Sequence, residues 1–476
     1  MKIRSLGSLL VTGTLIVTPL WGDIFGEVLE FSSVWEKVAA NSPSLRTKNL
    51  EIEAARSASD RAGLHWFPKL YTDVRTYQTD DPILNFTGKL GQRSATQSDF
   101  STASNRSNLS NFLDSNNQLY QNLNPNSANI FAKDTLNRPG SNGYSRGTIG
   151  LEFPLYEGGS KEAFKEIKEK ELQAQIHESE YFNKTLYIQT AIAFRSSLIF
   201  SEGVKEREKI LRQLSSFSST YRLDSFSNPV GHSGSLALKS VQLRLISEIK
   251  EKDLYKKESL ESIKIMSGGV LDNLQPSESS LAKFYDENLP LSVSASEVRT
   301  PVSKMLESYS GISKDKVSME NSKFLPKVGV YAEAYGYAGD RNFANSYNAG
   351  VYLQMNLLNP TDIGSKKEAE IQAKAAETKW KEARLKENSE FKILSEKERV
   401  LFQAGKDSEE SYRIQYEQLI LSQTLFKRGN IPATSLAESF SRTADALTRK
   451  EYIDLEYLRT RAQLTLYSGD NNASGN

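Results

Sequence analysis

The segment between Lys366 and about Arg428 constrains the fold more than any other part of the chain, because it contains no proline and one glycine, Gly405. As one helix, its roughly 60 residues would span about 90 Å at ~1.5 Å per residue. Its apolar residues keep the three-and-four spacing of a coiled-coil seam. These residues are Ala373, Ala376, Trp380, Ala383, Tyr412, Tyr416, Leu419 and Phe426. A helix this long does not fit in a globular core, so we predict that it packs against similar helices in an elongated bundle or tube.

A strand that runs into a charged helix occurs twice in the sequence. Residues 147–163 (GTIGLEFPLYEGGSKEA) and 350–369 (GVYLQMNLLNPTDIGSKKEA) both begin with alternating apolar residues and end in a helical pattern. Alternation is typical of a half-buried strand, and the three-and-four spacing is typical of an amphipathic helix. The recurrence after about 200 residues indicates an internal repeat.

The opposite change, from helix to strand, is also duplicated. It passes through Phe67-Pro68 in one half and through Phe324-Leu325-Pro326 in the other. Proline suits a point where a helix ends and a strand begins. Together the two kinds of junction predict four strands, at about 69–78, 146–156, 326–336 and 346–357.

Each half of the chain therefore reads as helix, strand, loop, strand, long helix, tight turn and helix. Ser-Leu-Ala motifs at 235–237 and 435–437 follow Gly/Pro-containing breaks and begin the last helix of each half. We predict a signal peptide at 1–22, a first repeat at 23–267, a joining segment at 268–300 and a second repeat at 301–476.

The first residues, MKIRSLGSLLVTGTLIVTPLWG, have the pattern of a secretory signal peptide. Lys2 and Arg4 precede an apolar run from about Leu6 to Val17. That run is too short for a membrane anchor, so a cleaved leader is predicted. The alternative is a buried N-terminal helix, and the cleavage point is not marked by an A-x-A pattern.

Several kinds of chemistry find no support in the sequence. A net charge of +1 does not predict a nucleic-acid surface. The absence of cysteine excludes disulfides, thiolate metal sites and cysteine nucleophiles. His65, His177 and His232 are widely separated, and the GGSK at 158–161 lacks the spacing of a phosphate loop. We expect no enzyme, no cofactor and no metal, with a secreted enzyme as the alternative from another class.

The predicted strands have one apolar and one polar face and a length of ~9–11 residues, which matches a tilted membrane strand. The polar face predicts a water-filled lumen. Its residues are Asp73, Arg75, Glu152, Glu333, Gln354 and Asn356. Four strands cannot close a barrel, and open edges are not viable in lipid. The missing strands must then come from other copies of the chain, which predicts an oligomer.

The main alternative keeps the same elements in water. It is an α+β protein with two half-exposed hairpins on a coiled-coil stalk, that is, a periplasmic structural or interaction protein without channel activity. This alternative leaves the leader pattern and the duplication unexplained.

Several segments resemble the TolC-type outer membrane efflux proteins, in the same order and over nearly the whole mature chain. They are NSPSL (41–45), FPKLY (67–71), PLYEGGSKEA (154–163), FLPKV (324–328) and FKRGNIPATSLAES (426–439). The resemblance implies a mostly α fold with a membrane β part: three chains form a 12-stranded β-barrel in the outer membrane of a Gram-negative-type cell, and their helices form a periplasmic α-barrel.

The same resemblance implies a homotrimeric exit duct for efflux or type I secretion. Its partners would be a periplasmic adaptor, an inner-membrane RND or ABC transporter, and outer-membrane lipid. The resemblance further implies that the joining segment, 268–300, lies at the equator of the helical part. Drugs, metal ions and secreted proteins all remain open as substrates.

The resemblance also implies a narrow periplasmic aperture at the turn before the last helix. Matched on Gly429, two positions that are often acidic fall on Ser435 and Glu438. Phe426 falls on an aromatic gate position, and Ile431 falls where an arginine can occur. The chain thus keeps one acid and the aromatic residue and lacks the second acid and the arginine.

Lys427 and Arg428 lie close by in the sequence and could supply a substitute cation. Ser235 is the equivalent position in the turn of the first repeat. The alternative for Glu438 is a solvated acid on a helix surface.

The connection between the first two strands, residues 80–145, is unusually long and rich in Ser, Asn, Gln and Asp. Loops of this length are usually functional or disordered. The segment could fold over the channel mouth, bind a surface partner, or form a mobile polar segment outside the cell. Its composition favours the mobile segment.

Overall fold

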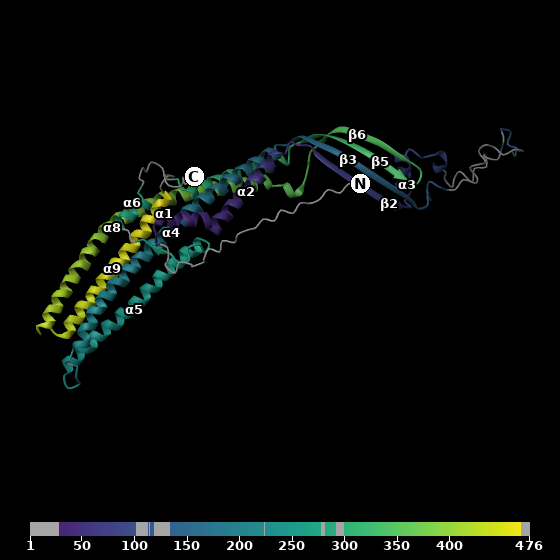
Figure 1. The fold of residues 1–476 in the computed structure, drawn as a ribbon. Coiled ribbons are helices and arrows are strands. Elements are labelled where there is room, and N and C mark those ends of the chain that lie inside the picture. The colour runs from purple at the N-terminus through teal and green to yellow at the C-terminus, as the bar shows by residue number, and fades with distance from the viewer. Residues whose placement is uncertain are drawn as a thin grey trace, which may run out of the picture. The chain divides into compact units, whose positions relative to one another are not determined.

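The computed structural model describes residues 28–100, 113, 115–118, 134–222, 224–277, 281–291 and 299–467 (Figure 1). The predicted signal peptide, 1–22, lies outside these residues. The described chain is mostly helical with one four-stranded antiparallel sheet. It divides into two compact units. The first contains residues 1–50, 177–303 and 383–476, and the second contains 51–176 and 304–382.

The second unit contains the sheet. Its strands are β2 (Lys69–Thr79), β3 (Asn142–Glu157), β5 (Lys327–Gly339) and β6 (Phe343–Gln354). They follow the order β2-β3-β5-β6 and every neighbouring pair is antiparallel. The four expected strands are therefore present, although β3 begins earlier than expected and Asn356 follows the end of β6. Because β2 and β6 pair on one side only, the sheet of this chain has two open edges.

Both strand-to-helix turns depend on glycine. Gly158 and Gly159 have φ angles of +70° and +82° before α4 (Ser160–Thr220), and Gly364 has a φ of +87° before α8 (Ser365–Lys427). Only glycine adopts this left-handed region without strain. A Cβ on Gly158 would also lie 2.7 Å from the carbonyl oxygen of Ser322. The strand-to-helix junction that occurs twice in the sequence thus has a glycine with a positive φ angle before the helix in both copies.

The remaining helices range from 8 residues in α6 to 38 residues in α5. They are α1 (Phe31–Asn41), α2 (Pro43–Gly63), α3 (Pro82–Gly91), α5 (Pro229–Met266), α6 (Leu281–Asn288), α7 (Pro301–Ser322) and α9 (Ala433–Leu464). A short parallel pair joins β1 (Val28–Leu29) to β4 (Gln275–Pro276). None of the helices in the described ranges combines the length and the apolar character needed to cross a bilayer.

The first unit is held together by two apolar clusters. In one, Phe31 packs edge-on against Tyr187, Phe194 and Phe284. In the other, α4, α5, α8 and α9 bury a seam of leucines around Phe440. The apolar seam predicted for the long helix α8 extends through both units. It is confirmed, because its eight residues are all buried or half-buried. Long helices with a narrow apolar seam are stabilised by such packing rather than by helix propensity alone.

The segment that begins the long 80–145 connection is folded. Residues 82–91 form α3, and a 3-10 turn follows at Gln97–Phe100. Asp81 caps α3 by accepting a hydrogen bond from the backbone N–H of Leu84 at 2.9 Å, and Pro82 opens the helix. The prediction of a mobile polar segment is therefore wrong for residues 80–100. Residues 101–112, 114 and 119–133 lie outside the described ranges.

Candidate functional site in the sheet and the helical turns

The register of the sheet separates a polar face from an apolar face. Directly opposed residues share a face, so Tyr71, Gly150, Glu333 and Asn348 lie together across the four strands. Five of the six residues predicted to face a lumen lie on strand positions of this polar face, and the sixth, Asn356, follows the end of β6. The five are Asp73, Arg75, Glu152, Glu333 and Gln354.

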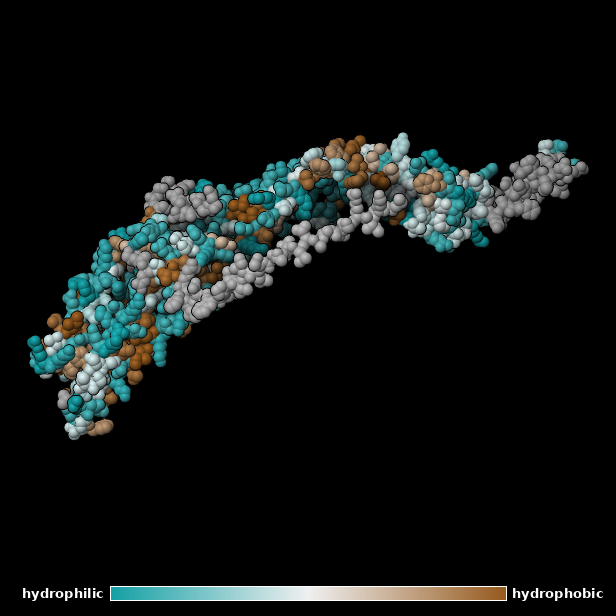
Figure 2. Space-filling model, viewed as in Figure 1, coloured by the Kyte–Doolittle hydropathy of each residue, from teal (hydrophilic) through white to brown (hydrophobic). Residues whose placement is uncertain are grey.

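The opposite face carries exposed apolar side chains. Its members include Leu70, Val74, Ile149, Leu151, Val351 and Leu353. Val351, for example, is 70% exposed. Figure 2 shows hydrophobic side chains gathered over the strands near β6. A contiguous exposed patch of this kind marks a surface that meets lipid or another protein.

Tyrosines fill the polar face and bind its carboxylates. Tyr71 and Tyr335 both donate hydrogen bonds to Glu333. Tyr352 donates to Glu152 at 3.0 Å. Sequence reasoning noticed the polar alternation but missed that these tyrosines hold the acids in place.

Glycines opposite the tyrosines make this arrangement possible. A Cβ on Gly150 would lie 2.3 Å from Cζ of Tyr71, and a Cβ on Gly329 would lie 2.5 Å from Cζ of Tyr352. Real Cβ atoms do not approach other atoms so closely, so these positions exclude a side chain. The alternation of Gly and Tyr in the strands was the sequence signal for this packing.

The turn between α8 and α9 holds the predicted aperture residues. Phe426 packs its ring 5.9 Å from that of Phe217 and 6.1 Å from that of Tyr221, within the same chain. The Lys427 ammonium lies 5.3 Å from the centre of the Phe217 ring. Arg428 is exposed beside Gly429, whose φ is +77°. The aromatic position is thus part of the helix packing in this chain.

Glu438 and Ser435 lie on the first turns of α9. Glu438 is exposed and accepts a hydrogen bond from Arg442, one helical turn later, at 2.6 Å. Ser435 is half-buried. Glu438 therefore has a cationic neighbour, Arg442, which the family resemblance did not predict.

The equivalent turn of the first repeat contains a polar cluster around Asp224. The Ser235 hydroxyl donates to Asp224 at 2.8 Å, and Nδ1 of His232 lies 2.7 Å from the other carboxylate oxygen. These contacts with His232 and Ser235 hold the pKa of Asp224 below its ordinary value. The sequence predicted Ser235 and missed its partner, because Asp224 precedes the break at which the helix begins.

A cavity of about 960 Å³ lies among α4, α6, α8 and α9 of the first unit. Asp454 is part of its lining, and burial raises the pKa of this carboxyl to about 6 against the opposing effect of Lys450. Tyr285 also lines the cavity, and burial raises the pKa of its hydroxyl. Neither residue was singled out by the sequence, since isolated polar residues on an amphipathic helix carry no periodic signal. In the part of the chain that the structure describes, no three His, Asp or Glu side chains lie close enough together to hold a metal ion.

Comparison with known proteins gives a consistent likeness in structure. No family model matches the chain, and no curated protein matches it by sequence. The solved structure of CusC, which forms a transmembrane channel, superposes with a TM-score of 0.73 at 10% identity and covers 94% of each chain.

Two further channels share the same architecture. The MtrE outer membrane channel of Neisseria gonorrhoeae superposes with a TM-score of 0.66 at 10% identity, over 92% of this chain and 88% of MtrE. The CmeC outer membrane channel of Campylobacter jejuni gives 0.64 at 10% identity, over 98% of this chain and 93% of CmeC. The likeness covers the strands and the long helices together. The chain therefore has the fold of the TolC-type outer-membrane channels.

Proposed function

We propose that three copies of this chain form an outer-membrane channel that serves as the exit duct of an efflux or type I secretion system. The observation that carries the proposal is the sheet, which has an apolar exposed face, a polar opposite face and two open edges. In water, such a sheet would expose both a large apolar patch and unpaired strand edges, which are aggregation hazards. In a membrane barrel, lipid covers the apolar face and neighbouring copies pair with the edges.

The polar face then lines a water-filled lumen. Asp73, Arg75, Glu152, Glu333 and Gln354 would face the solute, as predicted, together with the tyrosines that orient the acids. Acids and cations both lie on this face, where Arg75 pairs with Asp73 at 2.9 Å, and we propose that the lumen conducts passively. A passive duct needs a partner that supplies energy.

The proposed partners are a periplasmic adaptor and an inner-membrane RND or ABC transporter. The joining segment 268–300 is the proposed region of adaptor contact at the helical equator. The names of the structural neighbours, which are outer membrane channels, and the sequence resemblance support this assignment. The transported substrate stays open among drugs, metal ions and secreted proteins.

We also propose that a periplasmic aperture is surrounded by Phe426, Lys427, Arg428, Ser435 and Glu438, with Ser235 in the equivalent turn. Three copies of Glu438 around a narrow opening would concentrate cations, since like charges in a pore raise the local counter-ion density. The contact with Arg442 reduces this effect without cancelling it, because both side chains are exposed to water.

Cell fractionation followed by native mass spectrometry tests the proposal. We expect the full chain in the outer-membrane fraction with the mass of three mature copies. Recovery as a periplasmic monomer would favour the alternative of a coiled-coil structural protein.

A further inference from the structure

Helix α3 packs against the polar face of the sheet. It lies at the end of the sheet where β2 ends, at Thr79, and β6 begins, at Phe343. Its glycines allow very close contact with two tyrosines of that face. A Cβ on Gly88 would lie 2.6 Å from the Tyr144 ring, and a Cβ on Gly91 would lie 2.6 Å from the Tyr337 ring. The pairing register places Tyr144 and Tyr337 on the same polar face as Arg75.

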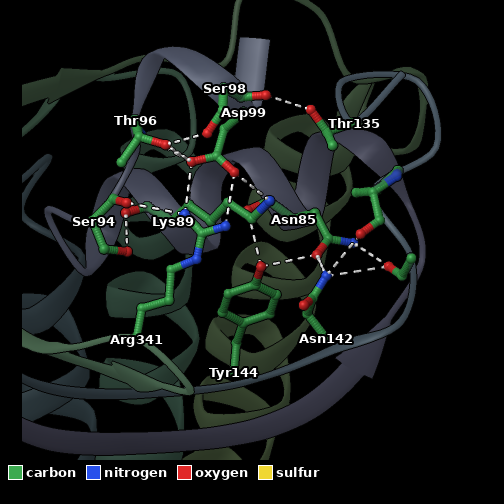
Figure 3. A network of polar contacts seen from close by, with 12 residues as sticks. Asn85, Lys89, Ser94, Thr96, Ser98, Asp99, Thr135, Asn142, Tyr144 and Arg341 are labelled. Atoms are coloured by element: carbon green, nitrogen blue, oxygen red, sulfur yellow. Dashed lines mark hydrogen bonds and ion pairs between the residues drawn. The ribbon is translucent and has the colours of Figure 1, made fainter. Parts of the chain in front are cut away.

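A buried ion cluster fixes the segment that contains α3 (Figure 3). Asp99 accepts hydrogen bonds from Lys89 at 3.0 Å and from Arg341, in the turn between β5 and β6, at 2.6 and 2.8 Å. Both Lys89 and Asp99 are buried. Such charge-assisted bonds are about twice as strong as neutral ones. They tie α3 to the sheet through a turn that is distant in the sequence.

A second set of contacts centres on Asn85. Its amide donates to the carbonyl of Thr79 at 2.9 Å, and its side-chain oxygen accepts from Tyr144 at 2.8 Å and from Asn142 at 2.7 Å. Asn85 thereby joins the end of β2 to the start of β3. The helix is anchored at both of its ends rather than resting loosely on the sheet.

The amphipathic character of α3 is inverted. The side toward the sheet carries Asn85, Gly88 and Lys89, all buried. The side away from the sheet carries Ile83, which is 73% exposed, and Leu90, which is 48% exposed. A surface helix normally buries its apolar stripe. Here the polar side is satisfied and the apolar side, two turns long, has no cover in the described chain.

We propose that this apolar stripe packs against the same stripe of two other copies and closes the distal end of the channel. The inference rests on the proposed function, in which the polar face that carries α3 lines the lumen. Threefold symmetry then brings three α3 helices together inside the barrel, with Ile83 and Leu90 toward the axis. An apolar constriction of this kind gates a pore by excluding water.

The dimensions agree with closure. Twelve strands about 4.8 Å apart and tilted by about 40° form a barrel with a backbone radius of about 12 Å. Three touching helices with diameters of roughly 10 Å fit within a circle of about 11 Å radius. Three copies of α3 thus fill the mouth, and solute passes only when they separate.

Disulfide cross-linking tests this contact directly, because the natural chain has no cysteine. In the purified trimer, oxidation of the Leu90→Cys variant with copper phenanthroline should link two of the three chains, and the covalent dimer should appear on a denaturing gel. Reduction should restore the monomer. The control is Ile149→Cys, which lies on the opposite face of the sheet and is exposed; it should give no dimer.

Conductance provides the second readout. The double variant Ile83→Asp, Leu90→Asp should raise the mean current of full-length trimers in planar bilayers about threefold or more, since three apolar contacts become repelling charges. Oxidised Leu90→Cys trimers should carry less current than reduced ones. If trimers conduct but neither cross-linking nor a current change occurs, the α3 contact is wrong and the channel assignment stands. If no trimer forms, both fail.

Discussion

Arg207 is fully buried, and its guanidinium donates hydrogen bonds to both carboxylate oxygens of Glu451, 244 residues further along the chain. Its remaining N–H groups donate to Glu248 at 3.1 Å, to the hydroxyl of Thr448 at 2.9 Å and to the carbonyl of Gly203 at 3.2 Å. Burial alone would lower the pKa of Arg207, but the two glutamates outweigh this effect and raise it. The cluster joins α4, α5 and α9 within the first unit.

The first prediction is that Glu451→Ala destabilises the protein by about 3–5 kcal/mol, because it leaves Arg207 buried without its main counter-charge. Chemical denaturation followed by circular dichroism measures the change. The matched control is Glu438→Ala, which removes an exposed pair and should cost no more than about 1 kcal/mol. Equal effects of the two variants would contradict a special role of the buried cluster.

The second prediction uses two positions on the same strand. Val351→Arg places a charge on the proposed lipid face and should cost about 2–4 kcal/mol, visible as reduced amounts of assembled protein in the outer membrane. Asn348→Arg places the same charge on the polar face and should assemble normally. If Asn348→Arg is the more harmful variant, the two faces have been assigned the wrong way round.

The third prediction concerns pH. The folded-state pKa of Asp454 is raised to about 6 from an ordinary value of 3.8, so the folded state binds the proton more tightly than the unfolded state. Stability should therefore fall as the pH rises from about 4 to about 6, by up to roughly 3 kcal/mol from this group. Asp454→Asn should remove that slope and stabilise the protein at neutral pH, as thermal melting in detergent will show.

A neighbouring acid provides the control for this experiment. Contacts with Lys397 and Arg459 lower the pKa of Glu456, so its contribution is present above its ordinary pKa and is lost as the pH falls. Glu456→Gln should therefore destabilise the protein at neutral pH. An Asp454→Asn variant with the same pH dependence as the natural chain would show that Asp454 ionises freely.

The features that the sequence predicted correctly are those that leave a periodic pattern of apolar residues. The alternating runs became β2, β3, β5 and β6, and the seam of the 60-odd residue helix is buried as expected. Each of these patterns is local, since it depends on which face of one element is covered. The order of the segments that resemble TolC-type proteins predicted how these elements combine into one fold.

The contacts that sequence reasoning missed join positions far apart in the chain. No residue near Arg207 in the sequence indicates that it pairs with Glu451. Likewise, no residue near Asp99 indicates that it pairs with Arg341, 242 residues away. Composition was misleading for residues 80–100, where the helix buries a polar side. The Asp81-Pro82 pair was a usable signal, because a capping acid followed by proline commonly starts a helix.

The fourth prediction addresses the aperture. If Glu438 lines it, Glu438→Gln should reduce cation selectivity in bilayer recordings with little change in trimer stability, and Glu438→Lys should move selectivity toward anions. Arg442→Gln, which frees the Glu438 carboxylate, should have the opposite effect to Glu438→Gln.

A lock between copies gives a different result. If Glu438 binds Arg428 of a neighbouring copy, then both Glu438→Gln and Arg428→Ser should raise the resting conductance. No change in selectivity or conductance with any of these variants would identify Glu438 as a solvated surface acid.

Electron cryo-microscopy of the protein purified from outer membranes tests the central claim most directly. The account predicts a threefold-symmetric particle in which β2 of each copy pairs with β6 of the next, so that the open edges disappear into a closed barrel. The polar face should point inward and the apolar face toward the detergent. A particle in which β2 and β6 remain unpaired, or in which the apolar face is buried against protein, would contradict the account.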